Sequence, residues 1–369
     1  MKSGRAAVFV APRQPFEIRE FPVPEPEPGA ILVKVRLCNI CGSDLHAWHG
    51  DFQTTKIGGA LPTILGHEMM GTVAKLGAGV HRDFNGAPLS EGDRVVFQYF
   101  THCGRCPQCL KGRTVSCLHS SMAMMGNCEQ PPHFVGGFAD YYYLKPNQVI
   151  FKVPDHVPDE VVSGANCALA QVIQGFQRVD LRFGETVVIQ GAGGLGIYAS
   201  AVAKHMGAKR VIVIDGVKER LELARQFGAD ETIDLQEYPD DRSRVARVRE
   251  LTDGIGADVV VELVGHPGVV NEGLNMLALS GRYLEIGNIS KGKVVELDPS
   301  KLVFGNKSIV GVSWYEPEAL KMAMDFLSKT IDLYPYHRLF AVKFKLSEIN
   351  HAFELAEKRA VPRATIVMD

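Results

Sequence analysis

The chain has little of what marks a membrane protein or a nucleic-acid-binding protein. Its 369 residues contain no apolar run long enough to span a bilayer. The formal net charge is only −2, so the composition points to neither nucleic acid nor an anionic membrane as a partner. We find no internal repeat and no low-complexity tract. With 46% hydrophobic and 22% charged residues, the composition is that of an ordinary globular protein, and the length allows two domains.

The first residues resemble a secretory signal only superficially. Residues 1–12 read MKSGRAAVFVAP, but the apolar run is short, lacks a small-residue cleavage site and is followed at once by Arg13. We therefore expect a first β-strand here, and a cytoplasmic protein. The eight cysteines fit that compartment, because clustered cysteines in a long cytosolic chain bind metal more often than they form disulfides.

Two patterns of secondary structure divide the chain. In residues 1–158, short predicted strands are separated by Gly and Pro residues, which indicates a β-rich domain with functional loops. In residues 159–299, helical segments alternate with buried strands, which indicates a doubly wound parallel sheet and the α/β class. Residues 300–369 complete that sheet and return to the first domain. Helices are expected at residues 219–227, 269–279, 316–329 and 347–360.

A glycine motif lies between two of the buried strands, residues 186–190 and 211–214. It has the G-x-G-x-x-G spacing and comprises Gly191, Gly193, Gly194, Leu195 and Gly196. Asp215 ends the second strand, about 20 residues after the motif, where a ribose-binding carboxylate is expected. A glycine-rich turn in an ordinary α/β unit is the alternative, but the two strands and the acid favour a dinucleotide site.

Four cysteines share one short loop, at the spacing C-x-x-C-x-x-C-x₇-C. They are Cys103, Cys106, Cys109 and Cys117. Four thiolates suit a closed, tetrahedral structural zinc site. An iron–sulfur cluster also uses four cysteines, but the surrounding segment lacks the usual redox context. Unliganded surface thiols are the remaining alternative, which oxidation disfavours.

A second ligand set is spread along the chain. Cys41 and His67 each follow a predicted strand, Glu68 adjoins His67, and Cys167 precedes the dinucleotide unit. Two thiolates and one imidazole match a catalytic zinc with an open fourth position. Taken singly, each residue has an ordinary structural alternative to metal binding. Cys167, in its alanine-rich segment, could be a small core residue. Two other cysteines are assigned to the core, Cys38 and Cys128.

These motifs together resemble the zinc-dependent medium-chain alcohol dehydrogenases over essentially the full chain. Residues 66–71 read GHEMMG, residues 41–46 read CGSDLH and residues 92–95 read GDRV, all as in that family, and the four-cysteine spacing matches. The resemblance implies a GroES-like catalytic domain and a Rossmann domain. It also implies zinc on Cys41, His67 and a third ligand that varies in the family among Cys, Asp and Glu. The longer loop at residues 80–91 departs from the family pattern.

The resemblance further implies hydride transfer between an alcohol and NAD, with zinc as the Lewis acid. Ser43 is then expected to hydrogen-bond the substrate oxygen, and the proton to pass through Ser43 and the nicotinamide ribose to His46, which ends the relay. Glu68 is implied as an alternate zinc ligand or a group behind the ligands. Arg363 resembles a family position at the cofactor pyrophosphate, and Arg220 is expected near the adenosine end. For both arginines, a solvated surface charge is an equal alternative.

The substrate is less determined. Aromatic and Met residues that favour a bulky or cyclic secondary alcohol are Trp48, Phe52, Met124, Met125, Trp314 and Tyr315. A polyol or threonine-type dehydrogenase stays an alternative, as does a catalytically silent structural protein on this fold. A strand at residues 308–312 is expected at the edge of the parallel sheet, where pairing with a second subunit makes a homodimer or homotetramer.

Overall fold

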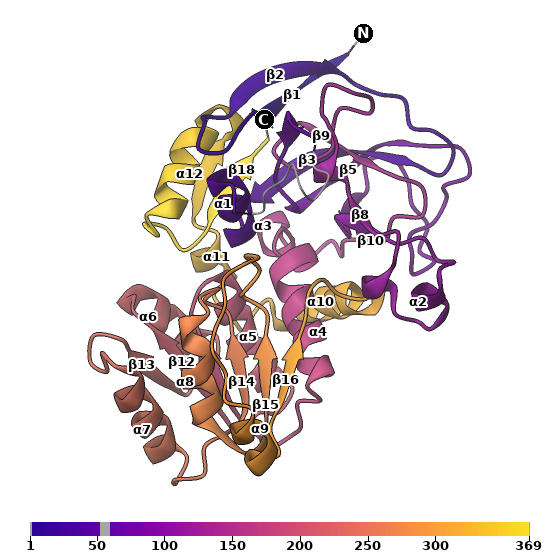
Figure 1. The fold of residues 1–369 in the computed structure, drawn as a ribbon. Coiled ribbons are helices and arrows are strands. Elements are labelled where there is room, and N and C mark those ends of the chain that lie inside the picture. Colours follow the sequence, from indigo (N-terminus) through magenta and orange to yellow (C-terminus); the bar gives the residue numbers. More distant parts are fainter. Residues whose placement is uncertain (1, 52–59, 369) are drawn as a thin grey trace. The chain divides into compact units, whose positions relative to one another are not determined.

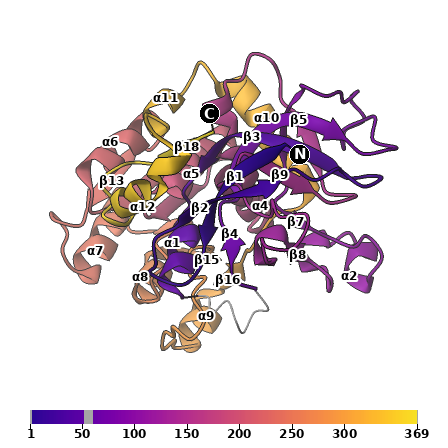
Figure 2. The same cartoon turned by 90° about the horizontal axis from the view of Figure 1, so that it is seen from above.

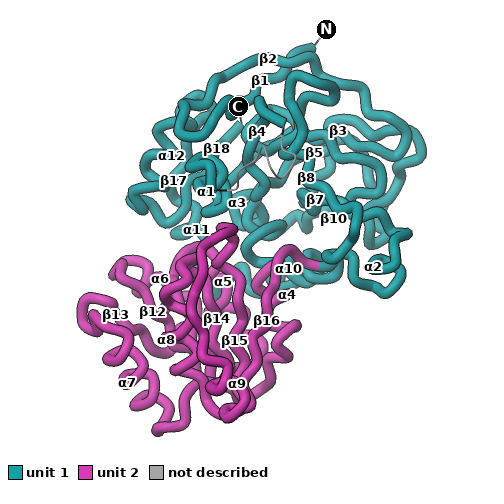
Figure 3. The backbone as a smooth tube through the Cα atoms, in the orientation of Figure 1, with its two compact units in different colours: residues 1–170, 316–369 teal, residues 171–315 magenta. Residues whose placement is uncertain are grey.

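The computed structural model describes residues 2–51 and 60–368, and the chain forms two compact units (Figure 3). Unit 1 comprises Met1–Ala170 and Glu316–Asp369, and unit 2 comprises Gln171–Tyr315. The limits drawn from the sequence at 158/159 and 299/300 follow changes of pattern and stay predictions. None of the helices in the described ranges combines the length and apolar character that a membrane crossing needs.

Unit 1 is built mainly from antiparallel strands. Its largest sheet has the order β10-β6-β5-β3-β18-β17, and β9 also pairs with β3. Figure 2 shows the C-terminal strand β18 beside β3, so the end of the chain completes this sheet. The strands of unit 1 are β1 Ser3–Phe9, β2 Glu17–Pro22, β3 Ile31–Asn39, β4 Thr63–Ile64, β5 Glu68–Leu76, β6 Arg94–Phe97, β7 Phe100–Thr101, β8 Ser121–Met122, β9 Tyr141–Leu144, β10 Ile150–Lys152, β17 Val342–Lys345 and β18 Ala364–Val367.

Short helices fill the connections of unit 1. Its α-helices are α1 Gly42–His49, α2 Pro107–Leu110, α3 Asp159–Val162, α10 Pro317–Thr330, α11 Tyr336–Leu339 and α12 Ile349–Glu357. A π-helical turn, η3, covers Ala165–Leu169, and the 3₁₀ turns are η1 Thr114–Ser116, η2 Ala123–Met125 and η4 Leu346–Glu348. The helices expected at 316–329 and 347–360 correspond to α10 and to η4 with α12.

Unit 2 holds a parallel six-stranded sheet with the order β13-β12-β11-β14-β15-β16 (Figure 1). Its strands are β11 Thr186–Gln190, β12 Arg210–Asp215, β13 Glu231–Asp234, β14 Ala257–Glu262, β15 Leu277–Glu285 and β16 Ser308–Gly311. Its helices are α4 Ala170–Arg178, which begins at the unit boundary, α5 Gly194–His205, α6 Lys218–Gln226, α7 Asp241–Leu251, α8 Gly268–Met276 and α9 Ser300–Gly305. This order is that of a Rossmann sheet, in which the chain adds strands first on one side of β11 and then, from β14 onward, on the other. The predicted α/β class is confirmed.

One predicted helix boundary in unit 2 is wrong. The helix expected at 269–279 ends at Met276, and the next three residues already belong to β15. Leu277 pairs with Ala257 of β14 and is 1% exposed, so strand pairing and burial outweigh its helical propensity. Helix α7 was not expected from the sequence, although Asp240 caps it by accepting a hydrogen bond from Ser243 N at 2.8 Å.

The edge strand β16 lies where the sequence placed it. Its outer side has no strand partner among the described residues, and Ile309 is 39% exposed. The preceding helix α9 exposes Val303 (71%) and Phe304 (84%). An apolar, unpaired sheet edge is a liability that a second subunit removes.

We therefore predict that the protein is a dimer or larger at micromolar concentration, as measured by light scattering. Ile309→Lys places a charge on the edge and should shift the protein toward monomer. The matched control is Ile255→Lys, since Ile255 is 67% exposed in the turn before β14, away from this edge. A monomeric unmodified protein would contradict the prediction.

Candidate active site and metal centres

The four-cysteine loop gathers its sulfur atoms in unit 1. The Sγ atoms of Cys103, Cys106, Cys109 and Cys117 all lie within 4.8 Å of one another. Cys106 Sγ is 3.5 Å from Cys109 Sγ and 3.9 Å from Cys117 Sγ. Tetrahedral zinc with bonds of about 2.3 Å separates its sulfurs by about 3.8 Å. The Cys109 backbone N–H is the main cause that lowers the pKa of Cys106 to about 6, which favours a thiolate. The donor set therefore fits structural zinc.

The four-cysteine loop is anchored from far along the chain. The Glu316 carboxylate accepts hydrogen bonds from Thr114 N at 3.1 Å and Val115 N at 3.3 Å, and also contacts the Thr114 hydroxyl. Leu110 and Leu118 of this segment are 76% and 67% exposed. The segment buries few apolar groups, so the Glu316 contact anchors it, and a metal on the four sulfurs would stabilise it further.

The second ligand set also converges, although its members come from separate segments. Donor atoms of Cys41, His67 and Cys167 lie within 4.8 Å of one another, and all three residues are buried. Cys41 is the residue before α1, His67 directly precedes β5, and Cys167 lies on the π-helical turn η3. All three belong to unit 1. Two sulfurs and one imidazole nitrogen fit zinc and leave one coordination position open.

Asp44 ties two of these ligand segments together. Its buried carboxylate accepts hydrogen bonds from Cys41 N at 2.9 Å and Gly66 N at 3.2 Å, and its Oδ1 lies 3.3 Å from His67 Nδ1. With Nδ1 facing a carboxylate, Nε2 is the nitrogen left for a metal. Burial acts to lower the pKa of His67, but the Asp44 carboxylate and Cys41 raise it well above its usual value. Sequence reasoning did not assign this role, although Asp44 stands within the residue 41–46 motif.

Of the two thiols in this ligand set, Cys41 has the lower pKa and Cys167 the higher. A hydrogen bond from Cys167 is the main cause that lowers the pKa of Cys41 well below its usual value, against the effect of burial. His67 and Ser43 act in the same direction. Ser43 Oγ lies 3.3 Å from His67 Nε2, so the hydroxyl borders the place where the three donors meet.

Glu68 and Arg363 form a buried ion pair. Glu68 is 0% exposed and accepts hydrogen bonds from Arg363 Nη1 at 2.5 Å and Nη2 at 3.0 Å. Burial raises the pKa of Glu68, and the guanidinium opposes that rise. Both carboxylate oxygens thus have a protein partner, and the group of converging donors does not include Glu68. Direct zinc ligation by Glu68, and a pyrophosphate contact by Arg363, stay predictions.

Helix α1 places His46 on the same face as Ser43, three residues earlier. His46 Nδ1 lies 2.7 Å from Asp51 Oδ2, and the two side chains are 27% and 31% exposed. The imidazole is thus oriented by a carboxylate and open to water.

The glycine motif in unit 2 has the geometry of a phosphate-binding turn. Gly191 adopts φ +100°, which favours glycine. A Cβ at Gly196 would lie 1.9 Å from the Gly191 carbonyl oxygen, so this close packing of strand and helix requires glycine. A Cβ at Gly193 would meet nothing within 4 Å, which leaves room for a ligand. Asp215 accepts hydrogen bonds from Ala192 N at 2.7 Å and Val217 N at 2.9 Å.

The remaining predicted cofactor residues lie around this turn. Gly194 and Leu195 begin α5, and Arg220 is a partly exposed residue on α6, the helix that follows Asp215. The structure brings the glycine motif and Asp215 together through the Ala192 hydrogen bond. A role for Arg220 stays a prediction.

Glu262 was not singled out from the sequence, because it ends a regular buried strand. It is 0% exposed, and its Oε1 accepts hydrogen bonds from Val264 N at 2.6 Å and Gly265 N at 2.7 Å. The turn that it holds packs against the first glycine of the motif, since Val264 Cγ2 lies 3.2 Å from where a Gly191 Cβ would stand. Burial first, and then the Glu285 carboxyl, raise the pKa of Glu262 to about 8.

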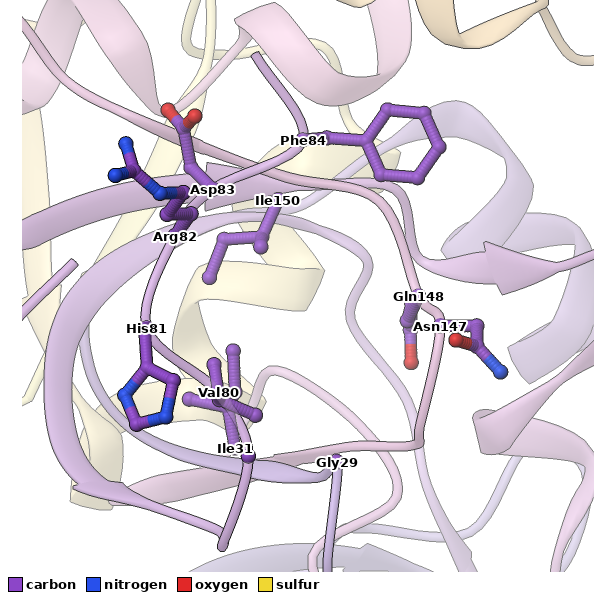
Figure 4. A pocket seen from close by; sticks show the side chains of 11 residues that line it. Gly29, Ile31, Val80, His81, Arg82, Asp83, Phe84, Asn147, Gln148 and Ile150 are labelled. Carbon is purple, nitrogen blue, oxygen red and sulfur yellow. The ribbon is translucent and has the colours of Figure 1, made fainter. Parts of the chain in front are cut away.

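The loop at residues 80–91 lines a hollow on unit 1 instead of the metal site. The hollow has a volume of about 440 Å³, and Figure 4 shows Arg82 and Asp83 on one side, and Asn147 and Gln148 on the other. None of the predicted catalytic or metal-binding residues lines it. Asp83 Oδ1 accepts hydrogen bonds from two backbone groups of the loop, Asn85 N and Ala87 N, so the loop is internally braced.

Two zinc ions per chain are expected, one at each ligand set. Cys106→Ser should remove one zinc and lower the melting temperature, because structural zinc contributes to folding free energy. Cys41→Ser should remove the other zinc and abolish turnover in a chain that stays folded. Elemental analysis with thermal unfolding checks both, and each variant is the control of the other. A single tightly held metal in active enzyme would rule out the two-site interpretation.

A pH dependence is expected from Glu262. Its folded pKa of about 8 exceeds the usual value of 4.5, so folding takes up a proton between these values. The protonated Glu262 carboxyl therefore contributes to the free energy of unfolding at low pH, and this contribution is lost as the pH rises from about 4.5 to 8. Glu262→Gln keeps an acceptor for the turn but cannot ionise, so its melting temperature relative to the unmodified protein should rise from pH 5 to pH 8.

The control for this pH dependence is Glu222→Gln, since the Glu222 side chain is 55% exposed. For Glu222→Gln, the difference in melting temperature should stay flat over the same pH range. A flat difference for Glu262→Gln as well would contradict the assignment of a raised pKa.

Comparison with known proteins agrees with these two units. Residues 27–155 match the alcohol dehydrogenase GroES-like domain, and residues 194–329 match the zinc-binding dehydrogenase family. The 5-exo-hydroxycamphor dehydrogenase of Pseudomonas putida is 35% identical over 370 residues, which cover 99% of each chain. An alcohol dehydrogenase structure from Thermotoga maritima has a TM-score of 0.93 at 29% identity, over 100% of both chains. A zinc-binding dehydrogenase from Sinorhizobium meliloti 1021, solved with NADP, has a TM-score of 0.85 at 26% identity, again over 100% of both chains. This chain therefore belongs to the zinc-binding dehydrogenases with a GroES-like domain, and it is an oxidoreductase.

Proposed function

We propose that this oxidoreductase transfers a hydride between a bulky or cyclic secondary alcohol and NAD at a zinc site. The observation that carries the proposal is the convergence of Cys41, His67 and Cys167 from three separate segments of unit 1. Buried thiols and an imidazole gathered in this way are what a catalytic zinc requires, and they are costly to collect without one. Zinc bound there would supply Lewis acidity to the oxygen of an alcohol or carbonyl.

The chain's own residues supply the proton path. Ser43 borders the donor group through its 3.3 Å contact with His67, where its hydroxyl can accept the proton of the substrate hydroxyl while it passes its own proton on. His46, on the same face of α1, is the next acceptor, and Asp51 Oδ2 orients its ring from 2.7 Å. The partial exposure of His46 lets the proton leave to water.

Unit 2 supports NAD as the hydride acceptor. The glycine turn offers backbone N–H groups and space for a pyrophosphate at the start of α5. Asp215 already accepts two backbone hydrogen bonds, yet each carboxylate oxygen keeps a second lone pair for a ribose hydroxyl. We propose Arg363 and Arg220 as further cofactor contacts.

The substrate class rests on the relatives more than on the pocket. The Pseudomonas putida relative is named for a hydroxycamphor, whose hydroxyl sits on a bulky bicyclic ring. Of the candidate lining residues, Met124 and Met125 are half-buried, whereas Trp48 donates a hydrogen bond to Gln14 O and packs on Phe353. Tyr315 is fully buried, and Phe52 lies outside the described residues.

We also propose a cytoplasmic location, because the two clusters of free cysteines fit a reducing compartment.

The experiment that tests this function is the absorbance at 340 nm with NAD⁺ and a panel of alcohols. Bulky cyclic secondary alcohols should give the highest kcat/KM. A preference for polyols or for threonine would favour the alternative substrate classes. No turnover with any alcohol, from protein that holds two zinc ions, would favour a silent structural role.

A proton relay through His46 predicts a change in the pH–rate profile. His46→Gln should slow alcohol oxidation at neutral pH by less than about 100-fold, since water can partly replace the relay, and should recover at high pH. The control is His49→Gln on the same helix, because His49 instead pairs with Glu357 at 2.8 Å. An unchanged pH–rate profile for His46→Gln would contradict the relay and leave His46 as a surface histidine without a catalytic role.

Cofactor choice should follow Asp215. A 2′-phosphate would meet this carboxylate at close range, and like-charge contact of this kind disfavours NADP. Lys218 and Arg220 oppose the effect, but the acid holds the ribose directly. We expect a preference for NAD⁺ of at least about tenfold in kcat/KM, roughly 1.4 kcal/mol.

Asp215→Ser should narrow that preference, mainly by weakening NAD⁺ binding. The control is Asp234→Ser, which removes an acid from the end of the adjacent strand β13. Equal or better kcat/KM with NADP⁺ in the unmodified enzyme would show that the basic residues outweigh Asp215.

A further inference from the structure

Asn166 lies beside a zinc ligand and is bonded to another ligand segment. It is 0% exposed and precedes Cys167 on the π-helical turn η3. The Leu169 N–H reaches back to the Gly164 carbonyl at 3.3 Å, which closes the wide turn. Single π-helical turns are rare and are frequently found at functional sites.

The Asn166 amide joins this turn to two distant segments. Its Nδ2 donates to the His67 carbonyl and to the Phe97 carbonyl, both at 3.0 Å. Phe97 ends β6, and His67 directly precedes β5, the strand paired with β6. One side chain therefore spans from the turn that carries Cys167 to the backbone of the residue that supplies the imidazole.

The Asn166 hydrogen bonds matter for zinc binding because zinc tolerates little variation in the distances to its ligands. Its bonds to sulfur and to nitrogen are about 2.3 and 2.0–2.1 Å, so the ligand segments must be held to within a few tenths of an ångström. Asp44 fixes Cys41 relative to His67 through the backbone N–H groups of Cys41 and Gly66, but among the described residues its hydrogen bonds do not extend to the segment of Cys167. The hydrogen bond that joins the turn of Cys167 to the backbone of His67 is donated by Asn166.

We propose that Asn166 is a positioning residue that holds Cys167 at the spacing from His67 that zinc requires. The inference rests on the proposed catalytic zinc site. Asn166 does not bind the metal, and it acts through the backbone of its neighbours. Groups behind metal ligands that act in this way typically change metal affinity by 10- to 100-fold.

A purely structural role is the competing explanation, because the two buried carbonyls need donors in any case. Gln148 offers a matched comparison within unit 1. It is 6% exposed, and its Nε2 donates to the Gln98 carbonyl at 2.5 Å and to Tyr142 Oη at 3.4 Å. It therefore loses the same kind of bonds when truncated, but it touches none of the converging ligands.

The experiment compares Asn166→Ala with Gln148→Ala in the full-length protein. The rate of zinc release to a chelator is measured separately for each of the two ions. The visible d–d absorption of the cobalt-substituted protein is also recorded. Asn166→Ala should weaken retention of one zinc about 10- to 100-fold and shift the cobalt spectrum, while the four-cysteine site keeps its metal. Gln148→Ala should lower the melting temperature and leave both readouts as in the unmodified protein.

Each outcome separates the inference from the proposed function. Release and spectrum unchanged in Asn166→Ala, with two zinc ions bound, would overturn the positioning role and leave the zinc site intact. An unmodified protein that holds metal only at the four cysteines would overturn the proposed function itself. If Asn166→Ala does not fold, Asn166→Ser, which keeps one donor, is measured, and faster release with a shifted spectrum is again the supporting result.

Discussion

The buried carboxylate of Asp44 is the contact on which the candidate active site depends. It bonds the backbone of Cys41 and of Gly66 and faces the imidazole of His67, so one side chain fixes two ligand segments and one ring orientation. A carboxylate with no exposure is costly to bury unless it is fully paired. Unit 1 meets that cost with backbone donors at the start of α1 and ahead of β5. The same strand β5 then begins with Glu68, whose charge is paired by Arg363 from the C-terminal end of the chain.

Local features of the site could be predicted from the sequence, and relations across the fold could not. The four cysteines lie within 15 residues, from Cys103 to Cys117, and the glycine motif with its flanking strands is also continuous. Spacing alone therefore predicts that these groups come together. The roles of Asp44, Asn166 and Glu262 depend on which carbonyl or N–H lies opposite, and that follows only from strand pairing and packing.

The same limit applies to the fold. Alternating helical and β-branched segments predicted the parallel sheet, because periodicity reports burial directly. The end of α8 was misplaced because Leu277, Ala278 and Leu279 continue the apolar residues of the helix before Ser280 and Gly281 interrupt them. Its strand conformation comes from pairing with β14, an interaction over 20 residues in sequence from Ala257 to Leu277. Long-range pairing therefore decided a boundary that local propensity left ambiguous.

The two candidate metal centres of unit 1 meet different physical requirements. The four-cysteine segment exposes Leu110 and Leu118 and is anchored from outside by Glu316, so a metal there would supply the stability that a hydrophobic core gives elsewhere. Cys41, His67 and Cys167 are instead buried, and hydrogen bonds made by the side chains of Asp44 and Asn166 hold the segments that carry them. A site organised in this way can leave one coordination position open without losing its shape. That difference is why the first ligand set suits a structural ion and the second suits chemistry.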